Sequence, residues 1–205
     1  MLGYGRRTLR GLLLAVLPSI WSAPGAWAQQ PDRPLTLPKR DVAVIYRFEG
    51  SGTDGMHKMQ VTYADAGERV RIDYFRWFEE KLPYLSLIFD HPADRLISVE
   101  AERQAYFERQ IGNHDNPGVF MRTDMRLTRL GMGVVGNAPC TEWKVEVPGK
   151  DDKQGKACVT DDGIVLDLAS TTPSVTSLIA AEVRYGPPPD GTFDPPAGFR
   201  RDEPP

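Results

Sequence analysis

The sequence predicts a mainly β protein, an antiparallel sheet of about eight to ten strands. Apolar and polar residues alternate in several segments, and turn-forming residues separate these segments at short intervals. Alternation with a period of two indicates strands that bury one face and expose the other. The close spacing of the turns favours hairpins over βαβ units, and signals for helices are few.

The alternating segments all lie between residues 41 and 185. Each has apolar side chains at every second position, and charged or polar side chains lie between them except at Ala43, Ile45, Ile88 and Ala180. Because successive side chains of a strand point to opposite faces, each segment has one face suited to a core. The clearest segments are 42–48, 70–74, 85–89, 143–147 and 179–185.

Two short segments predict helices. Phe75, Phe78 and Leu82 have the i, i+3, i+7 spacing of one helical face. Asn116 followed by Pro117 is typical of a helix start, because proline is tolerated in the first turn.

The N-terminus has the three parts of a secretory signal. Arg6, Arg7 and Arg10 precede the apolar run 12–17, and a small-residue A-x-A site ends at Ala28. The run is shorter than the roughly 20 residues that span a bilayer, which disfavours a retained anchor. We therefore expect cleavage after Ala28 and a periplasmic protein. Arg6 and Arg7 partly match a twin-arginine signal, so the export route stays open.

The remaining chain is a mildly acidic single domain. Residues 29–205 contain 22 Lys and Arg against 28 Asp and Glu, a net charge of −6. Nucleic-acid binding requires a clustered basic face, so we expect no nucleic-acid partner. Proline-rich residues 29–40 are expected to form a flexible lead-in, 41–200 a single β domain, and 201–205 a tail.

Cys140 and Cys158 are the two cysteines. In an oxidising compartment, such a pair is expected to form a disulfide rather than a metal site. A hairpin turning at Pro148 and Gly149 would place Cys140 opposite residue 157 or 158, within reach of a bridge. A turn centred on 151–153 would instead place Cys140 opposite Ile164, and the bridge would then need a bulge.

The motifs of enzymes and cofactor sites are weak. Gly131, Gly133 and Gly136 match G-x-G-x-x-G, but a strand pattern follows them where a phosphate-binding helix is needed. These glycines are better explained as a bend into the strand that contains Cys140. No G-x-S-x-G motif occurs, and the paired acids lie in turn-like or surface positions. We expect no enzyme activity and no cofactor.

Metal binding is likewise not expected. The histidines His57, His91 and His114 lie in or beside turns, without the i, i+4 spacing of a helical ligand pair. A copper site at Met56, His57 and Met59 is conceivable because copper accepts thioether and imidazole ligands. Exposed histidine and buried methionine explain the same residues more simply.

The most informative segment is 74–89, which is rich in aromatic and aliphatic residues. A short aromatic helix or loop over an open sheet can be a cover for the core or the mouth of an apolar pocket. The sequence leaves both alternatives open.

Segments 136–145, 157–166 and 193–199 together resemble a family of uncharacterised exported bacterial proteins. That family is similar to the lipoprotein-carrier superfamily (LolA/LolB-like). The resemblance implies a curved antiparallel half-barrel whose concave face is covered by one to three short helices. It also implies a cradle for acyl chains or another apolar ligand.

The resulting hypothesis is a periplasmic binding or carrier module for a lipid-like or other apolar ligand. The alternative is a non-enzymatic envelope protein that acts structurally or through a protein partner. After signal cleavage, no membrane-spanning segment is expected. The expected ligand-binding residues are Phe75, Arg76, Trp77, Phe78, Leu82, Leu85, Leu87 and Phe89.

Overall fold

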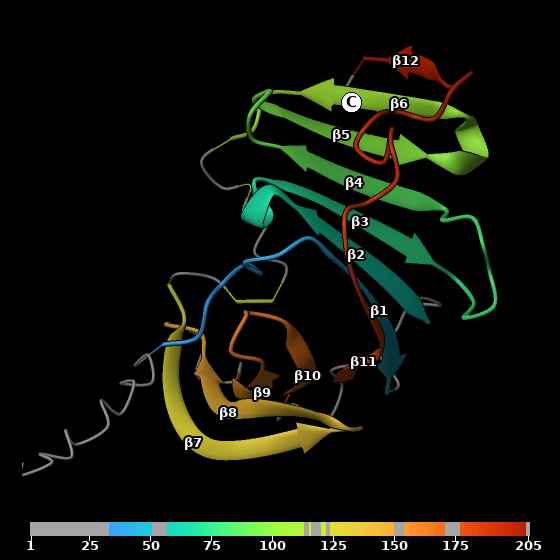
Figure 1. Cartoon of the computed structure of the whole chain (residues 1–205). Coiled ribbons are helices and arrows are strands. Elements are labelled where there is room, and N and C mark those ends of the chain that lie inside the picture. Colours follow the sequence, from blue (N-terminus) through green and yellow to red (C-terminus); the bar gives the residue numbers. More distant parts are fainter. Residues whose placement is uncertain are drawn as a thin grey trace, which may run out of the picture. The chain divides into compact units, whose positions relative to one another are not determined.

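The computed structural model describes residues 33–50, 57–112, 115, 120–121, 124–149, 154–170 and 177–203. Within these residues the fold is one curved sheet of twelve strands (Figure 1). The spatial order is β12-β6-β5-β4-β3-β2-β1-β11-β10-β9-β8-β7. All described pairings are antiparallel except the parallel contact of β12 with β6. The predicted antiparallel β class is therefore confirmed, with more strands than expected.

The strands follow the alternating segments of the sequence, and two 3-10 turns, η1 and η2, connect hairpins. The strands are β1 Val42–Glu49, β2 Lys58–Ala64, β3 Arg69–Phe75, β4 Leu85–Asp90, β5 Arg95–Glu100, β6 Ala105–Arg109, β7 Arg126–Val135, β8 Ala138–Glu146, β9 Gln154–Val159, β10 Val165–Ser170, β11 Ser177–Tyr185 and β12 Arg200–Asp202. The turns are η1 Asp65–Gly67 and η2 Ala101–Arg103.

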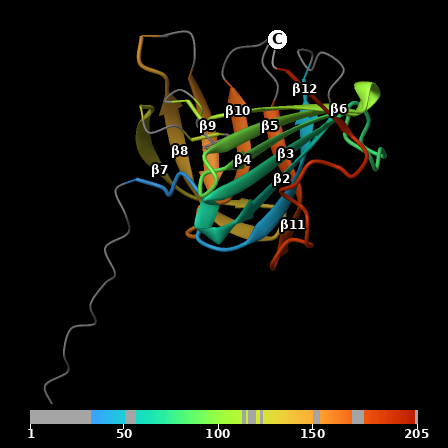
Figure 2. The same ribbon diagram turned by 90° about the horizontal axis from the view of Figure 1, so that it is seen from above.

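The sheet consists of two meanders joined at its centre. Strands β1 to β6 follow one another towards one edge, and β7 to β11 run from the other edge back to the middle. There β1 pairs with β11, from Val42 opposite Tyr185 to Glu49 opposite Ser177. Consequently, the connection between β6 and β7 must pass from one edge of the sheet to the other. Figure 2 shows the two meanders as wings of the curved sheet.

The inner face of the sheet is the side that bears Val44, Val61 and Trp143. The pairing register places Val44 opposite Val61, and Val61 opposite Ile72, so one apolar row crosses β1, β2 and β3. Val44 and Val61 are fully buried in a core cluster that also contains Trp143 of the other wing. Burial of this face from both wings is the main apolar contribution to stability.

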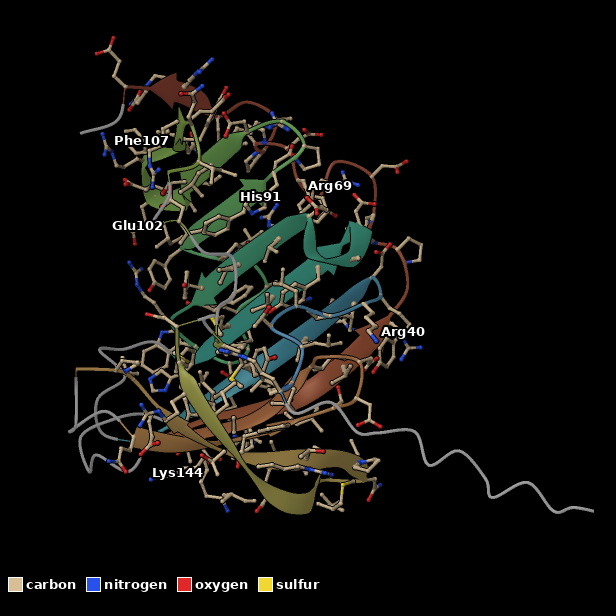
Figure 3. All side chains as sticks on the ribbon, turned by 90° about the vertical axis from the view of Figure 1, so that its left-hand side faces the viewer. Arg40, Arg69, His91, Glu102, Phe107 and Lys144 are labelled. Atoms are coloured by element: carbon tan, nitrogen blue, oxygen red, sulfur yellow. A yellow bond between two sulfur atoms is a disulfide. The ribbon has the colours of Figure 1, made fainter. Side chains whose placement is uncertain are left out.

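The outer face of the β2–β6 wing is covered by the C-terminal segment (Figure 2). Phe193 packs in a second apolar cluster with Ile88 and Ile97. The guanidinium of Arg69, labelled in Figure 3, lies 4.8 Å from the centre of the Phe193 ring. The segment then forms β12 against β6. Residues 201 and 202 of the expected tail thus belong to the edge strand β12.

Three local expectations were wrong. No α-helix occurs in the described part of the chain, so the helices expected over the concave face are absent there. Residue 75 ends β3 and residues 76–84 form turns, because the carboxylate of Glu80 accepts the backbone N–H groups of Arg76 and Trp77. Gly131 and Gly133 lie within β7 rather than in a bend, and only Gly136, with a φ of 59°, is in the turn.

The cysteine bridge is present, with a different register from the expected one. Cys158 lies opposite Glu142, so Cys140 is diagonal to it across β8 and β9. The Cα atoms are 5.5 Å apart, within the range for a disulfide. The hairpin register therefore lies between the two alternatives considered from the sequence.

Several expectations fall on residues outside the described ranges. These are the signal sequence 1–28, the copper alternative at Met56, His114, and the helix start at Asn116 and Pro117.

Candidate functional site

Described residues of the connection between β6 and β7 cover part of the inner face. Among its described residues, Phe120 and Met121 are buried in the core cluster, and Ile111 and Met125 pack against it. The rings of Phe120 and Tyr46 meet edge to face, with centroids 4.8 Å apart and an interplanar angle of 64°. The cover of the apolar face is thus part of a connection and not a second sheet.

The N-terminal segment 33–41 closes one end of this face. Leu37 packs against the core cluster. A Cβ atom on Gly67 would lie 2.9 Å from the Leu37 side chain, and one on Gly163 would lie 2.6 Å from its carbonyl oxygen. Glycine at both turns therefore permits the close approach. Arg33 donates to the carbonyl oxygen of Met125, which links the segment to the covering connection.

An ion pair anchors the same segment. Arg40, labelled in Figure 3, pairs with Asp162 at 2.6 Å and lies over the Tyr185 ring. Burial raises the pKa of Asp162, but hydrogen bonds from Thr160, Arg40 and Tyr185 outweigh it and lower the pKa below its ordinary value. The expected lead-in thus contains residues held against the sheet.

Tyr46 and Trp143 are two of the polar side chains buried on the inner face, and they differ in their partners. The Tyr46 hydroxyl donates to the carbonyl oxygen of Val165 at 2.9 Å. The indole N–H of Trp143 is buried and has no hydrogen-bond partner among the described residues. Trp143 is 3% exposed, and it lies between Arg129 of β7 and Ala157 of β9 in the strand register. A buried donor without an acceptor is uncommon, because leaving it unpaired costs about 1–3 kcal/mol.

The expected ligand-binding residues lie on different faces of the sheet. Leu85, Leu87 and Phe89 lie on the inner face, where Leu87 is opposite Ile72 and Phe89 is buried. Phe75 lies opposite Lys58 on the outer face. A single pocket with Phe75 above Leu87 and Phe89 is therefore inconsistent with the strand register.

The other four expected residues lie in the β3–β4 loop. Trp77, Phe78 and Leu82 are 59%, 40% and 82% exposed. Trp77 stacks on His57 with centroids 5.1 Å apart, and Arg76 pairs with Glu102 at 2.6 Å. Trp77, Phe78 and Leu82 thus form an exposed apolar surface and do not cover the inner face.

Lys58 explains why the loop turns to the outer face. Its ammonium group lies 4.0 Å from the centre of the Phe75 ring and donates to the carbonyl oxygen of Glu80. Burial lowers the pKa of Lys58, while Glu80 and Glu79 raise it in part. The lysine thus holds both ends of the loop segment 75–80 together.

The outer face has a polar pocket that the sequence did not indicate. It has a volume of about 380 Å³ and lies between the sheet and the start of the C-terminal segment. In its wall, Arg71 donates to the carboxylate of Asp73 at 2.8 Å and to the carbonyl oxygen of Thr192 at 2.9 Å. Ser86 donates to Asp73 at 2.5 Å. The lining residues are Ala43, Gln60, Thr62, Arg71, Asp73, Arg184, Tyr185, Gly186, Pro187, Pro188, Pro189 and Thr192.

Within the described ranges, the protein shows neither a metal-binding cluster nor a membrane-spanning helix. No cluster of three or more His, Cys, Asp or Glu side chains suited to a metal occurs among those residues. None of the helices in that same part of the chain has the length and apolar character needed to cross a membrane.

No protein-family model and no curated protein matches the sequence. Similar folds do occur among solved structures. An uncharacterized conserved protein from Thermus thermophilus has a TM-score of 0.57 and 7% identity, over 80% of this chain and 91% of that chain. MucB has a TM-score of 0.53 and 10% identity, over 80% of this chain and 60% of its own. This chain therefore spans less than two thirds of MucB.

MucB has also been solved in complex with MucA(peri), and that structure has a TM-score of 0.51 and 9% identity, over 78% of this chain and 56% of that chain. A LolA superfamily protein from Nitrosomonas europaea matches with a TM-score of 0.37 and 10% identity, over 76% of this chain and 90% of that chain. At such identities the likenesses concern the fold alone, and the last score is too low to relate the two folds in detail.

Proposed function

We propose that this protein is a non-enzymatic binding module of the bacterial periplasm that holds an apolar ligand on the inner face of its sheet. The observation that carries the proposal is the indole N–H of Trp143, a buried donor without a partner among the described residues, on a mainly apolar face. The periplasmic location rests on the export signal expected at residues 1–28 and on the disulfide.

The chemistry of the site favours a ligand with an apolar chain and one oxygen acceptor. The indole N–H is a neutral donor and has no acceptor capacity, so it suits a carbonyl, ester or carboxyl oxygen. The core cluster that contains Trp143 is mainly aliphatic and aromatic and offers burial to the chain, while Arg129 lies opposite Trp143 in the register. Fatty acids and acyl esters combine both features.

The cover of the face is compatible with such a ligand. Phe120 and Met121 come from a connection rather than from the sheet itself. An acyl chain would replace part of the apolar contacts that these two side chains make with the inner face. The apolar surface of the inner face would therefore stay shielded from water.

Palmitate is a suitable probe, and tryptophan fluorescence is a direct readout. Beyond residue 28 the chain contains two tryptophans, Trp77 and Trp143. The Trp77→Phe variant therefore isolates the buried indole. Palmitate should shift or quench its emission, whereas a ligand bound at the exposed loop would leave it unchanged.

A second variant tests the hydrogen bond itself. Trp143→Phe keeps an aromatic ring and removes the N–H, so palmitate affinity measured by calorimetry should fall about 5–10-fold. The free energy of unfolding without ligand should fall by about 1–3 kcal/mol, because the smaller ring leaves a cavity in the core, so affinity is compared on protein shown to be folded. Absence of palmitate binding, together with lipid-free protein by mass spectrometry of periplasmic material, contradicts the proposal.

A protein partner is the second candidate. Trp77, Phe78 and Leu82 expose a cluster of large apolar side chains on one loop, and such clusters mark interaction sites. The solved complex of MucB with MucA(peri) is an example of a protein of similar fold that binds a polypeptide. Two results together would support a protein partner. Palmitate would fail to bind, and Trp77→Ala would abolish a specific protein contact without loss of stability.

A further inference from the structure

The two edges of the sheet differ in whether another strand lies beside them. At one edge β6 is covered by β12, whose residues Arg200, Arg201 and Asp202 are all charged. At the other edge β7 has no further strand beside it among the described strands (Figure 1). An open edge presents unpaired backbone N–H and C=O groups to any strand that can approach it.

The two halves of β7 also differ from each other. The first half contains Arg126 and Arg129, and a bulge lies between Arg129 and Gly131. Charged residues and bulges are the usual protection of an edge strand. The second half, 131–135, contains no charge, no proline and no bulge, so it lacks this protection.

Exposed apolar side chains concentrate at the same place. Leu130, Met132 and Val134 are 51%, 62% and 68% exposed, and they lie within five residues of one strand. Large apolar side chains grouped on an open edge indicate an interface. The edge therefore offers both backbone pairing and apolar contact.

We propose that a second copy of this chain pairs with β7 across residues 131–135, antiparallel and about a two-fold axis at Gly133. In this register Met132 lies opposite Val134 of the second copy, and Gly131 lies opposite Val135 of the second copy. The contact is isologous and closed, so it gives a dimer and not a fibre.

The charge pattern selects a second copy as the occupant. With the axis at Gly133, the exposed side chains of Met132 and Val134 meet each other, and Arg129 and Leu130 lie beyond the paired segment on both copies. A register centred in the first half of β7 would oppose arginines or bulges. The paired positions themselves thus oppose no charged residues, although the Arg129 side chain of each copy reaches Met132, with Nη2 3.9 Å from Sδ.

Gly133 suits a position on the axis. A Cβ atom there would lie 2.8 Å from Cγ of Glu142 and 2.9 Å from Sγ of Cys158. Glycine therefore keeps β7 close to the disulfide and places no side chain between the two copies. The segment is only five residues long, so the dimer should be weak, with a Kd of about 10 µM to about 1 mM.

Sedimentation over about 10 µM to about 1 mM protein tests the dimer. The full protein should change reversibly from monomer to dimer, and Val134→Lys should weaken the dimer at least about tenfold. Leu82→Lys is the matched control, because it makes the same kind of change at an exposed apolar side chain of the β3–β4 loop, and it should leave the dimer unchanged.

A cross-linking experiment tests the register. A mixture of Met132→Cys and Val134→Cys proteins should form an interchain disulfide, whereas each variant alone should form little, because each position faces the other. A monomer at all concentrations overturns the proposal, and so does a dimer that survives Val134→Lys. Preferential cross-linking of Val134→Cys to itself overturns the register.

Discussion

The hydroxyl of Tyr46 in β1 donates a hydrogen bond of 2.9 Å to the carbonyl oxygen of Val165 in β10, 119 positions later in the chain. The bond passes over β11, which lies between the two strands in the sheet. It therefore connects the two wings through a side chain, in addition to the backbone pairing of β1 with β11. Tyr46 also contacts Phe120, so one residue joins both wings to the cover of the inner face.

Replacing Tyr46 by phenylalanine should lower the free energy of unfolding by about 1–2 kcal/mol. The change keeps the ring but leaves a buried carbonyl oxygen without this donor. Tyr63→Phe is the matched control on the neighbouring strand, because the Tyr63 hydroxyl makes no hydrogen bond within the described residues, and it should cost less. Urea unfolding measures both, and equal losses would show that the bond to Val165 contributes nothing specific.

Alkaline pH should destabilise the fold. Burial raises the pKa of Tyr46 well above its ordinary value, with a smaller contribution from Tyr63, and burial also raises the pKa of Tyr63. Above about pH 10 the unfolded chain loses phenolic protons that the folded chain keeps. The free energy of unfolding is therefore unaffected by these groups below about pH 10 and falls as pH rises further.

The measurement is urea unfolding at several pH values between neutral and about pH 11. The double variant Tyr46→Phe, Tyr63→Phe should show a shallower decline than the unaltered protein. An identical decline in both proteins would assign the effect to other groups.

Reduction of the Cys140–Cys158 disulfide should lower the free energy of unfolding by about 3 kcal/mol. The bridge spans a sequence separation of 18 residues, and a loop of this length loses roughly that much entropy in the unfolded state when closed. Both cysteines are buried, so a mild reductant should act slowly unless the protein unfolds. Urea midpoints with and without reductant measure the effect, and unchanged midpoints after confirmed reduction contradict it.

Replacing Asp73 by alanine should release part of the C-terminal segment. Arg71 is largely buried and would lose its carboxylate, which typically costs about 3–5 kcal/mol when one partner of a buried pair is removed. Because Arg71 also donates to the carbonyl oxygen of Thr192, the segment should become more sensitive to protease. Limited proteolysis compares this variant with Asp190→Ala, an exposed carboxylate of the same segment, which should change nothing.

The strands were predictable because their signal is local. Segments 42–48, 70–74, 85–89 and 179–185 all lie within strands of the structure, and each shows its alternation within a few residues. The cysteine pairing was also predictable, since two cysteines in an exported chain leave one bridge to form. The precise register was not predictable, because it depends on the length of the hairpin turn.

The helix predicted for the aromatic segment 75–82 does not form, and the reason is physical. The spacing of Phe75, Phe78 and Leu82 fits a helix, but β3 continues to Phe75 because Lys58 lies opposite it in β2. That pairing depends on the register of two strands, and no local sequence pattern indicates it. Within the described residues, two further features depend on the order of the strands in the sheet. These are the unpartnered indole of Trp143 and the open edge at β7. The alternation pattern of the sequence does not indicate strand order, so neither feature was predictable.

Pairing of β1 with β11 also has a consequence for the order of folding. The ladder joins positions 42 and 185, so the central strand pair cannot form until almost the whole chain is available. Each meander is built from hairpins and can form early, whereas closing a loop of about 140 residues must precede the central ladder. Contacts of this separation slow folding, so the rate-limiting step should be the meeting of two preformed meanders. Until that step, β1 and β11 are themselves open edges, and a chain with slow closure is most exposed to aggregation there.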